Sequence, residues 1–324
     1  MTSTDWNFVA DTPDLRFDGR VAVVTGGGRG LGRAYALMFA ARGAKVVVND
    51  SGGALDGLES GDGGDTGPAH DVVRDIVDAG GEAVASTDSV ATPEGGQAII
   101  GTALERFGGV DILVHNAGIV RRASLKDMSY DDFEAVLDVH LRGAFHVVRP
   151  SFPVMCAAGY GRIVLTSSIG GLYGNHDVAN YAVAKAGVIG LSNVAAMEGA
   201  AHNVTSNVIV PAAVTRMAAG IDTSAYPPMG PELVAPVVGY LGHESCTATG
   251  EMFVALAGRV ATAVVTESPG VYRPEWAIED VAEHLTAIRD RSEPVTFPVV
   301  PDGHNDHIRY SFAMAGRQQG AVHA

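Results

Sequence analysis

Residues 21–32 read VAVVTGGGRGLG, and residues 45–50 read KVVVND. The first stretch is a β-branched run followed by glycines at 26, 30 and 32, where a segment of helical periodicity begins. Glycines at this spacing allow a tight turn and let a pyrophosphate approach backbone amides at a helix N-terminus. A strand, a glycine cluster, a helix and a second strand in this order predict a dinucleotide-binding βαβ unit.

Asp50 ends the second run, close to the expected position of the acidic residue that hydrogen-bonds the adenosine ribose. A carboxylate there repels a 2′-phosphate, so we expect NAD rather than NADP. Arg29 in the glycine cluster opposes this expectation, because it could stack on adenine or pair with a phosphate. The alternative is that Arg29 is a solvated loop side chain.

Short β-branched runs alternate with segments of helical period along most of the chain. This alternation is typical of an α/β, doubly wound parallel sheet, here of about seven strands. We expect strands at 21–25, 45–49, 82–86, 112–115, 162–166, 205–210 and 252–255, and helices at 31–42, 69–79, 94–107, 130–157, 179–202 and 232–241. The expected organisation is an N-terminal lead-in (1–19), a dinucleotide-binding and catalytic domain (20–258) and a C-terminal extension (259–324) that packs on the body or on a partner subunit.

The composition excludes several classes of function. The 22 Lys and Arg against 37 Asp and Glu give a formal net charge of −15, which disfavours nucleic acid and anionic membranes as partners. Two cysteines, Cys156 and Cys246, cannot form a disulfide framework and indicate a reducing compartment. We expect no metal site and a cytoplasmic location.

Three further residues form a catalytic pattern. Tyr181 and Lys185 share one helix face at i, i+4 spacing, and Ser168 follows a predicted strand thirteen residues before Tyr181. Oxidising an alcohol needs a base, and free tyrosine titrates near ~10. One ammonium at ~4 Å, at an effective dielectric of ~20, contributes about 4 kcal/mol, enough to lower a pKa by ~2–3 units. We therefore expect Lys185 to lower the pKa of Tyr181.

TGGGRGLG, Asn116-Ala117-Gly118, Ser168 and YAVAK together resemble the short-chain dehydrogenase/reductase family over about residues 18–260. The resemblance implies a Rossmann fold in which Tyr181 is the general acid/base, Ser168 hydrogen-bonds the substrate oxygen and Lys185 holds the nicotinamide ribose. It implies that the chain forms a homodimer or homotetramer through the helices around 130–157 and 179–202. It also implies these cofactor-binding positions: Gly26, Arg29, Gly30, Leu31, Gly32, Asp50, Asp88, Ser89, Asn116, Ala117, Gly118, Tyr181, Lys185, Pro211 and Thr215.

Within that family, the segments GRAYALMFAARGAKVVVNDSGG, DVHLRGAFHVVRP and TSSIGGLYGNHDVANYAVAKAG resemble the D-3-hydroxyacyl-CoA dehydrogenase part of the peroxisomal multifunctional enzyme of β-oxidation. The implied reaction converts a (3R)-3-hydroxyacyl-CoA to a 3-ketoacyl-CoA. The cations Arg121, Arg122, Lys126 and Arg142 would serve the CoA phosphates, or they form a solvated surface run. Two alternatives remain: a hydroxysteroid or terpene alcohol dehydrogenase, and a non-catalytic NAD-binding partner protein.

Two histidines depart from the family pattern. His140 stands where many members have an asparagine that anchors a water in a proton relay. We assign it as a catalytic residue, with a packed, hydrogen-bonded core histidine as the alternative. His115 replaces the first asparagine of the usual Asn-Asn-Ala-Gly run, with no clear consequence.

Overall fold

The computed structural model describes residues 15–54, 56–57, 67–215 and 226–322. Residues 1–14 of the lead-in, and most of the stretch 51–68, which is rich in Gly and acidic residues, lie outside the described residues. Within them, eight strands form one sheet in the order β3-β2-β1-β4-β5-β6-β7-β8. The strands are β1 (Val21–Thr25), β2 (Lys45–Asn49), β3 (Glu82–Ser86), β4 (Ile112–His115), β5 (Gly161–Thr166), β6 (Val204–Ala212), β7 (Met252–Leu256) and β8 (Arg259–Ala263).

The first seven strands are parallel, and β8 is antiparallel to β7. The predicted doubly wound sheet is therefore confirmed, with one strand more than expected. The strand order reverses between β1 and β4, and ligands of such sheets bind at this reversal, beyond the carboxyl ends of the strands. All five residues of β1 are buried, which explains why this strand is a continuous apolar run.

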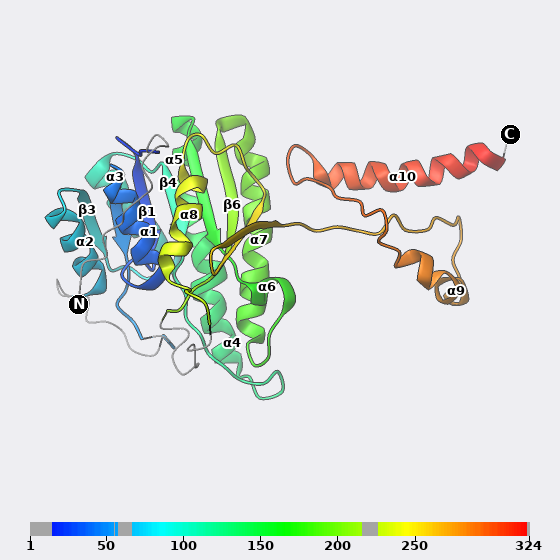
Figure 1. Cartoon of the computed structure of the whole chain (residues 1–324), viewed down its shortest axis with the longest axis horizontal. Helices are drawn as coiled ribbons and strands as arrows, with labels where there is room; N and C mark the ends of the chain where they lie inside the picture. Colours follow the sequence, from blue (N-terminus) through cyan, green and yellow to red (C-terminus); the bar gives the residue numbers. More distant parts are fainter. Residues whose placement is uncertain (1–14, 55, 58–66, 216–225, 323–324) are drawn as a thin grey trace.

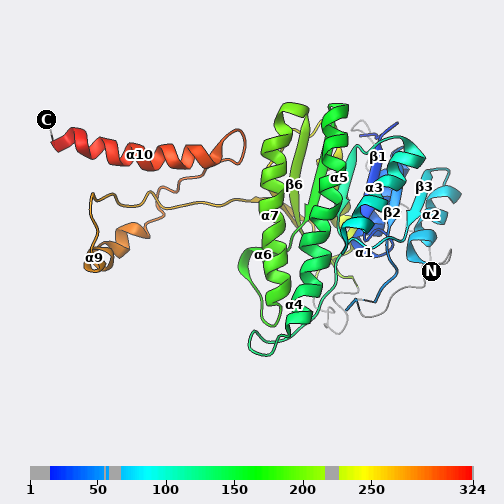
Figure 2. The ribbon, with the colours of Figure 1, turned by 180° about the vertical axis from the view of Figure 1, so that it is seen from behind.

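Helices cover both faces of the sheet. Figure 1 views the face that carries α1 (Gly30–Ala41) and α8 (Ala235–Gly242), and α2 (Pro68–Asp78) packs beside α1. Figure 2 shows the opposite face, with α3 (Pro93–Phe107), α5 (Gly143–Ala158) and α7 (Ala179–Gly199). Each face of the sheet has its own apolar core. None of the described helices is long and apolar enough to cross a lipid bilayer.

The helix predicted at 130–157 is interrupted. It consists of α4 (Tyr130–Leu137), a π-helical turn η1 (Asp138–Arg142) and α5. A π-helical turn widens the helix by one residue and often occurs at functional sites. Here it holds His140, whose side chain is buried.

The C-terminal extension begins with β8, which belongs to the sheet, and then leaves the body as an arm (Figure 1). The arm carries α9 (Ile278–Ile288) and α10 (Gly303–Val322). One face of α9 carries an apolar stripe. Its Ile278, Val281 and Leu285 side chains are exposed on this single chain.

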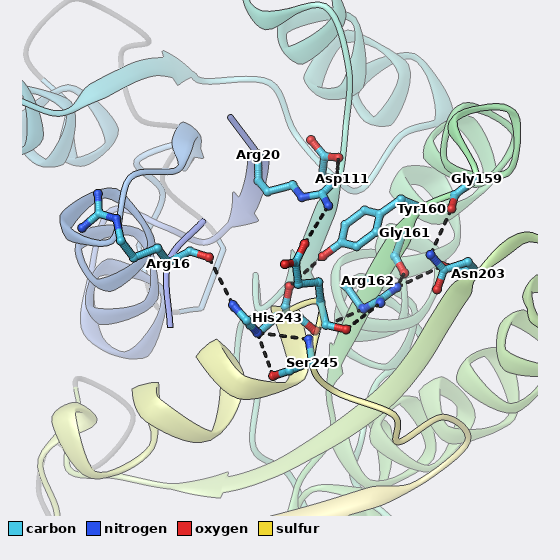
Figure 3. A network of polar contacts seen from close by, with 12 residues as sticks. Arg16, Arg20, Asp111, Gly159, Tyr160, Gly161, Arg162, Asn203, His243 and Ser245 are labelled. Carbon is cyan, nitrogen blue, oxygen red and sulfur yellow. Dashed lines mark hydrogen bonds and ion pairs between the residues drawn. The ribbon is translucent and has the colours of Figure 1, made fainter. Parts of the chain in front are cut away.

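The amino ends of the central strands are joined by a polar network, shown in Figure 3. Arg162 is 3% exposed, and its guanidinium donates to the carbonyl oxygens of Gly161 (2.8 Å), Asn203 (2.9 Å), His243 (3.3 Å) and Glu244 (3.5 Å). The Arg162 guanidinium also lies 4.3 Å from the centroid of the Tyr160 ring.

Arg20 completes this network. Its guanidinium lies 3.6 Å from the centroid of the same Tyr160 ring and forms ion pairs with Asp111 (3.0 Å) and Glu244 (3.1 Å). Cations above aromatic rings are stabilised by the ring quadrupole. The network thus connects the starts of β1, β4 and β5 to the end of α8.

Candidate active site

The glycine turn after β1 has no space for a Cβ at several positions, Gly26 and Gly32 among them. A Cβ on Gly32 would lie 2.0 Å from the carbonyl oxygen of Gly26, and a Cβ on Gly26 would lie 2.8 Å from the Cα of Ala117. Gly26 and Gly30 also have positive φ angles, of 62° and 53°. The turn therefore leaves the N-terminus of α1 uncovered by side chains, which suits the pyrophosphate of a dinucleotide.

Asp50 lies against this turn. One carboxylate oxygen accepts a hydrogen bond from the Gly28 N–H (3.1 Å), and the other accepts from the Gly52 N–H (2.9 Å). Arg29 donates from its guanidinium to the Gly53 carbonyl oxygen at 3.3 Å. Backbone groups of the segment that follows β2 thus hold both the Asp50 carboxylate and the Arg29 guanidinium at the cleft.

A cleft of about 840 Å³ runs from the glycine turn along the carboxyl ends of the strands. This volume lies in the usual range for cofactor and small-molecule sites. Most of the predicted site residues line the cleft: Gly26, Arg29, Gly30, Leu31, Asp50, Asp88, Ser89, Asn116, Ala117, Gly118, His140, Tyr181, Lys185, Pro211 and Thr215. Gly32 and Ser168 are the two predicted residues that do not line it; Gly32 is enclosed in the turn.

Ser168 lies beside Tyr181. Its hydroxyl caps α6 (Ile169–Tyr173) by accepting from the Gly170 N–H at 3.1 Å, and it is hydrogen-bonded to the Tyr181 phenol. Lys185 lies one turn further along α7, with Nζ 5.6 Å from the centroid of the Tyr181 ring. The structure therefore brings the three predicted catalytic side chains together.

Burial dominates the electrostatics of this group. It raises the pKa of Tyr181, against the opposing effects of the Ser168 hydrogen bond and the Arg122 charge. Burial also lowers the pKa of Lys185 to about 7, while its amine donates to the Thr166 carbonyl oxygen at 2.5 Å. The expectation that Lys185 lowers the pKa of Tyr181 is thus wrong for the chain without cofactor. It assumed a full charge at ~4 Å and omitted the desolvation of both groups.

His140 packs against Tyr181. The two rings meet edge to face with centroids 5.1 Å apart, and a Cβ on Gly118 would lie 2.2 Å from Cε1 of the imidazole. Nε2 contacts both the Ile119 carbonyl oxygen (2.8 Å) and the Ile119 N–H (3.1 Å). Nδ1 is buried without a hydrogen-bond partner among the described residues. Burial holds the pKa of His140 well below its usual range, so the ring is neutral.

Sequence reasoning missed the residue that anchors the start of α7. Asn180 is fully buried, donates to the carbonyl oxygens of Arg121 (3.1 Å) and Asp132 (3.0 Å), and accepts from the Tyr181 N–H (2.7 Å). It fixes the first turn of the helix that carries Tyr181. The only signal for Asn180 in the sequence is its place directly before Tyr181. The two carbonyl oxygens that it binds belong to residues about 50 positions away, so no local pattern predicts these bonds.

A family model for short chain dehydrogenases matches residues 20–224, which is more than half of the chain. The chain is a short-chain dehydrogenase. The dehydrogenase is 51% identical over 285 residues to the peroxisomal multifunctional enzyme type 2 of Drosophila melanogaster, a match that covers 86% of this chain and 46% of that protein. The solved structure of that full-length enzyme has a TM-score of 0.74 at 40% identity, and the match covers 91% of this chain and 50% of that chain.

A hydroxyacyl-CoA dehydrogenase of Mycobacterium tuberculosis is 35% identical over 300 residues, covering 86% of this dehydrogenase and 90% of that protein. The resemblance seen in the sequence is confirmed. The dehydrogenase spans about half the length of the fruit-fly protein.

The cations expected to serve CoA phosphates differ in their surroundings. Arg121 donates to the Asp56 carbonyl oxygen (2.8 Å) and pairs with Asp132 (3.1 Å). Arg142 pairs with Glu134 and Asp138. Arg122, Lys126 and Arg142 are exposed, and Lys126 lies 3.9 Å from the Asp127 carboxylate.

Proposed function

We propose that this dehydrogenase oxidises a (3R)-3-hydroxyacyl-CoA to the 3-ketoacyl-CoA with NAD as the hydride acceptor. The observation that carries the proposal is the cluster of Ser168, Tyr181 and Lys185, of which Tyr181 and Lys185 line the same cleft as the glycine turn. The acyl-CoA substrate class is supported by the similarity to the hydroxyacyl-CoA dehydrogenase of Mycobacterium tuberculosis.

The preference for NAD rests on Asp50. Its carboxylate is fixed by two backbone N–H groups at the cleft wall, where it would accept hydrogen bonds from ribose hydroxyls and repel a 2′-phosphate. The cofactor-binding positions expected from the sequence are part of this proposal. We place the pyrophosphate at the glycine turn, the adenine beside Asp88 and Ser89, and the nicotinamide beside Pro211 and Thr215.

When bound, the nicotinamide supplies a carbon that accepts hydride. Tyr181 must first lose its own proton, against the burial that raises its pKa. Its phenolate oxygen then accepts the proton of the substrate hydroxyl as the C=O bond forms, and in the reduction direction the phenol donates that proton. Ser168, already hydrogen-bonded to the phenol, holds the substrate oxygen. Lys185 would bind the nicotinamide ribose next to Tyr181. His140, which we assign as a catalytic residue beside Tyr181, would relay the proton that the Tyr181 phenol loses, and its unpartnered Nδ1 is the nitrogen free to accept it.

The test is a comparison of substrates and cofactors by absorbance at 340 nm. A (3R)-3-hydroxyacyl-CoA should react faster than the same acyl group as free acid, and faster with NAD than with NADP. Equal rates on thioester and free acid would contradict the CoA assignment, and turnover of hydroxysteroids or terpene alcohols alone would replace it. NADH binding without turnover of any alcohol would favour a non-catalytic NAD-binding protein.

We also propose that the chain is a homo-oligomer built on the outward faces of α5 and α7, where Phe145, Val183 and Val194 are about half exposed, with the extension 259–324 packed on the assembly. Sedimentation of the full chain measures its oligomeric state. The cytoplasmic location stays a prediction, while the name of the fruit-fly relative places that protein in peroxisomes. Microscopy of a tagged chain distinguishes the two compartments.

A further inference from the structure

A second buried histidine lies behind the cleft. His115 is the last residue of β4 and is paired in register with Thr25, the last residue of β1. Both side chains are completely buried. Neither residue lines the cleft, yet each is followed by a turn that does.

The hydrogen bonds around Thr25 determine which nitrogen of His115 carries the proton. The Thr25 hydroxyl oxygen accepts from the backbone N–H groups of Asn116 (3.1 Å) and Ala117 (3.2 Å). A hydroxyl has two acceptor sites and one proton, so its proton is left to donate to Nδ1 of His115 at 3.0 Å. Nδ1 is then an acceptor, and Nε2 carries the hydrogen that is donated to the His140 carbonyl oxygen at 3.2 Å.

We propose that His115 is a positioning residue, fixed as the Nε2–H tautomer, that couples two parts of the site. Through Nδ1 it holds Thr25 and thereby the turn at 116–118 that faces the cofactor. Through Nε2 it holds the π-helical turn η1, which presses the His140 imidazole against Tyr181. The kinetic part of this inference rests on the proposed function.

The surroundings keep this arrangement in one protonation state. Burial and the nearby Lys185 charge lower the pKa of His115 to about 3, with a smaller effect from His146, while carbonyl oxygens of Val139 and His140 oppose this. The ring is therefore neutral at physiological pH. A neutral imidazole with one donor and one acceptor matches one hydroxyl proton on one side and one carbonyl oxygen on the other.

Two substitutions separate the two hydrogen bonds. An asparagine amide ends near the position of Nδ1, so H115N keeps the contact with Thr25 and loses the contact with the His140 carbonyl. A glutamine amide extends to the position of Nε2, so H115Q keeps the His140 contact and loses the Thr25 contact. Losing one buried hydrogen bond changes an equilibrium or rate by about tenfold.

We expect H115N to lower kcat about tenfold while NADH affinity, measured by fluorescence, stays within about twofold. We expect H115Q to weaken NADH binding about tenfold while kcat at saturating NAD stays within about twofold. H202Q, at an exposed histidine, controls for substitution in general and should change neither. Parallel losses of kcat and NADH affinity in both variants would overturn the coupling, and so would no loss in either.

Nitrogen NMR of the ¹⁵N-histidine-labelled wild type tests the tautomer without any substitution. The expected spectrum shows one His115 ring with Nε2–H from pH 5 to 9. An Nδ1–H form, or titration near pH 6.5, would overturn the proposal. This measurement and the NADH affinities remain decisive if no hydroxyacyl-CoA is oxidised, so failure of the proposed function is distinguishable from failure of this inference.

Discussion

The two ends of strand β5 each contact a buried cation, and the two cations are satisfied very differently. At the amino end, Arg162 donates to four carbonyl oxygens and stacks on Tyr160, which Arg20 covers as well. At the carboxyl end, the Lys185 amine donates to the Thr166 carbonyl oxygen, and its pKa is lowered to about 7.

Buried polar groups without partners occur near both ends. Among the described residues, the His140 Nδ1 and the Thr166 hydroxyl lack partners at the carboxyl end, and the Thr205 hydroxyl, in register with Arg162, lacks one at the amino end. Buried polar groups are normally paired, and those that are not often belong to functional sites. A saturated network stabilises one arrangement, whereas groups with spare hydrogen-bonding capacity can bind a ligand or move a proton.

The largest effect is expected from Tyr181→Phe, which removes the proton acceptor and keeps the ring. Oxidation of hydroxyacyl-CoA should fall about 10³-fold, a typical contribution of general acid–base catalysis, with NADH affinity almost unchanged. Steady-state rates and fluorescence titration measure the two quantities. Residual activity equal to wild type would remove Tyr181 from the mechanism.

Arg162→Met tests the opposite end of β5. Burying the four carbonyl oxygens without their donor should lower the free energy of unfolding by about 3 kcal/mol, while folded molecules keep normal turnover. Urea denaturation measures this, with exposed Arg106→Met as the control at about 0.5 kcal/mol or less. If Arg162→Met and Arg106→Met lowered the free energy of unfolding by the same small amount, the polar network around Arg162 would contribute little to stability.

Gly109 and Gly118 lie on either side of strand β4. Replacing each of them by alanine compares the effect of an added methyl group at the two ends of the sheet. At Gly118, after the strand, the new Cβ would lie 2.2 Å from the His140 ring and should displace it, lowering kcat about 10–100-fold. At Gly109, before the strand, a Cβ meets no atom within 4 Å and should change nothing. Unchanged kcat in G118A at saturating NAD would show that the place of the imidazole is unimportant.

Lys185 should make stability depend on pH. Its pKa is about 7 in the folded chain against an ordinary value of 10.5, so between these values the unfolded chain binds more protons. Unfolding free energy of the wild type, relative to Lys185→Met, should therefore rise from about pH 7 toward pH 10, by at most ~1.4 kcal/mol per pH unit. Denaturant titrations at several pH values measure the difference. A flat difference would mean that Lys185 keeps its ordinary pKa.

The parts of the fold that the sequence predicted are those with local causes. The buried β-branched run at 21–25 and the glycines after it leave few alternatives, because only a parallel strand and a tight turn accommodate them. Strand β8 also had a local signal that was overlooked. Ala257 and Gly258, with φ angles of 48° and 80°, form a two-residue hairpin loop between β7 and β8.

The parts that escaped prediction depend on distant segments. The π-helical turn has no periodicity of its own that distinguishes it from the helices around it. Apart from one adjacent residue each, the partners of Asn180 and Arg162 lie 41 to 82 residues away, so the burial of these two side chains could not be inferred locally. The pKa of Tyr181 was misjudged for the same reason, because desolvation is set by the whole surrounding structure.

The most direct measurement uses (3R)-3-hydroxybutanoyl-CoA carrying deuterium on the alcohol carbon, mixed with NAD and the wild-type chain. Mass spectrometry of the reduced cofactor should show the deuterium transferred to the nicotinamide, together with 3-ketobutanoyl-CoA in equal amount. Reduced cofactor without deuterium, or no reduced cofactor although NADH binds, would contradict hydride transfer at the Tyr181 end of the cleft.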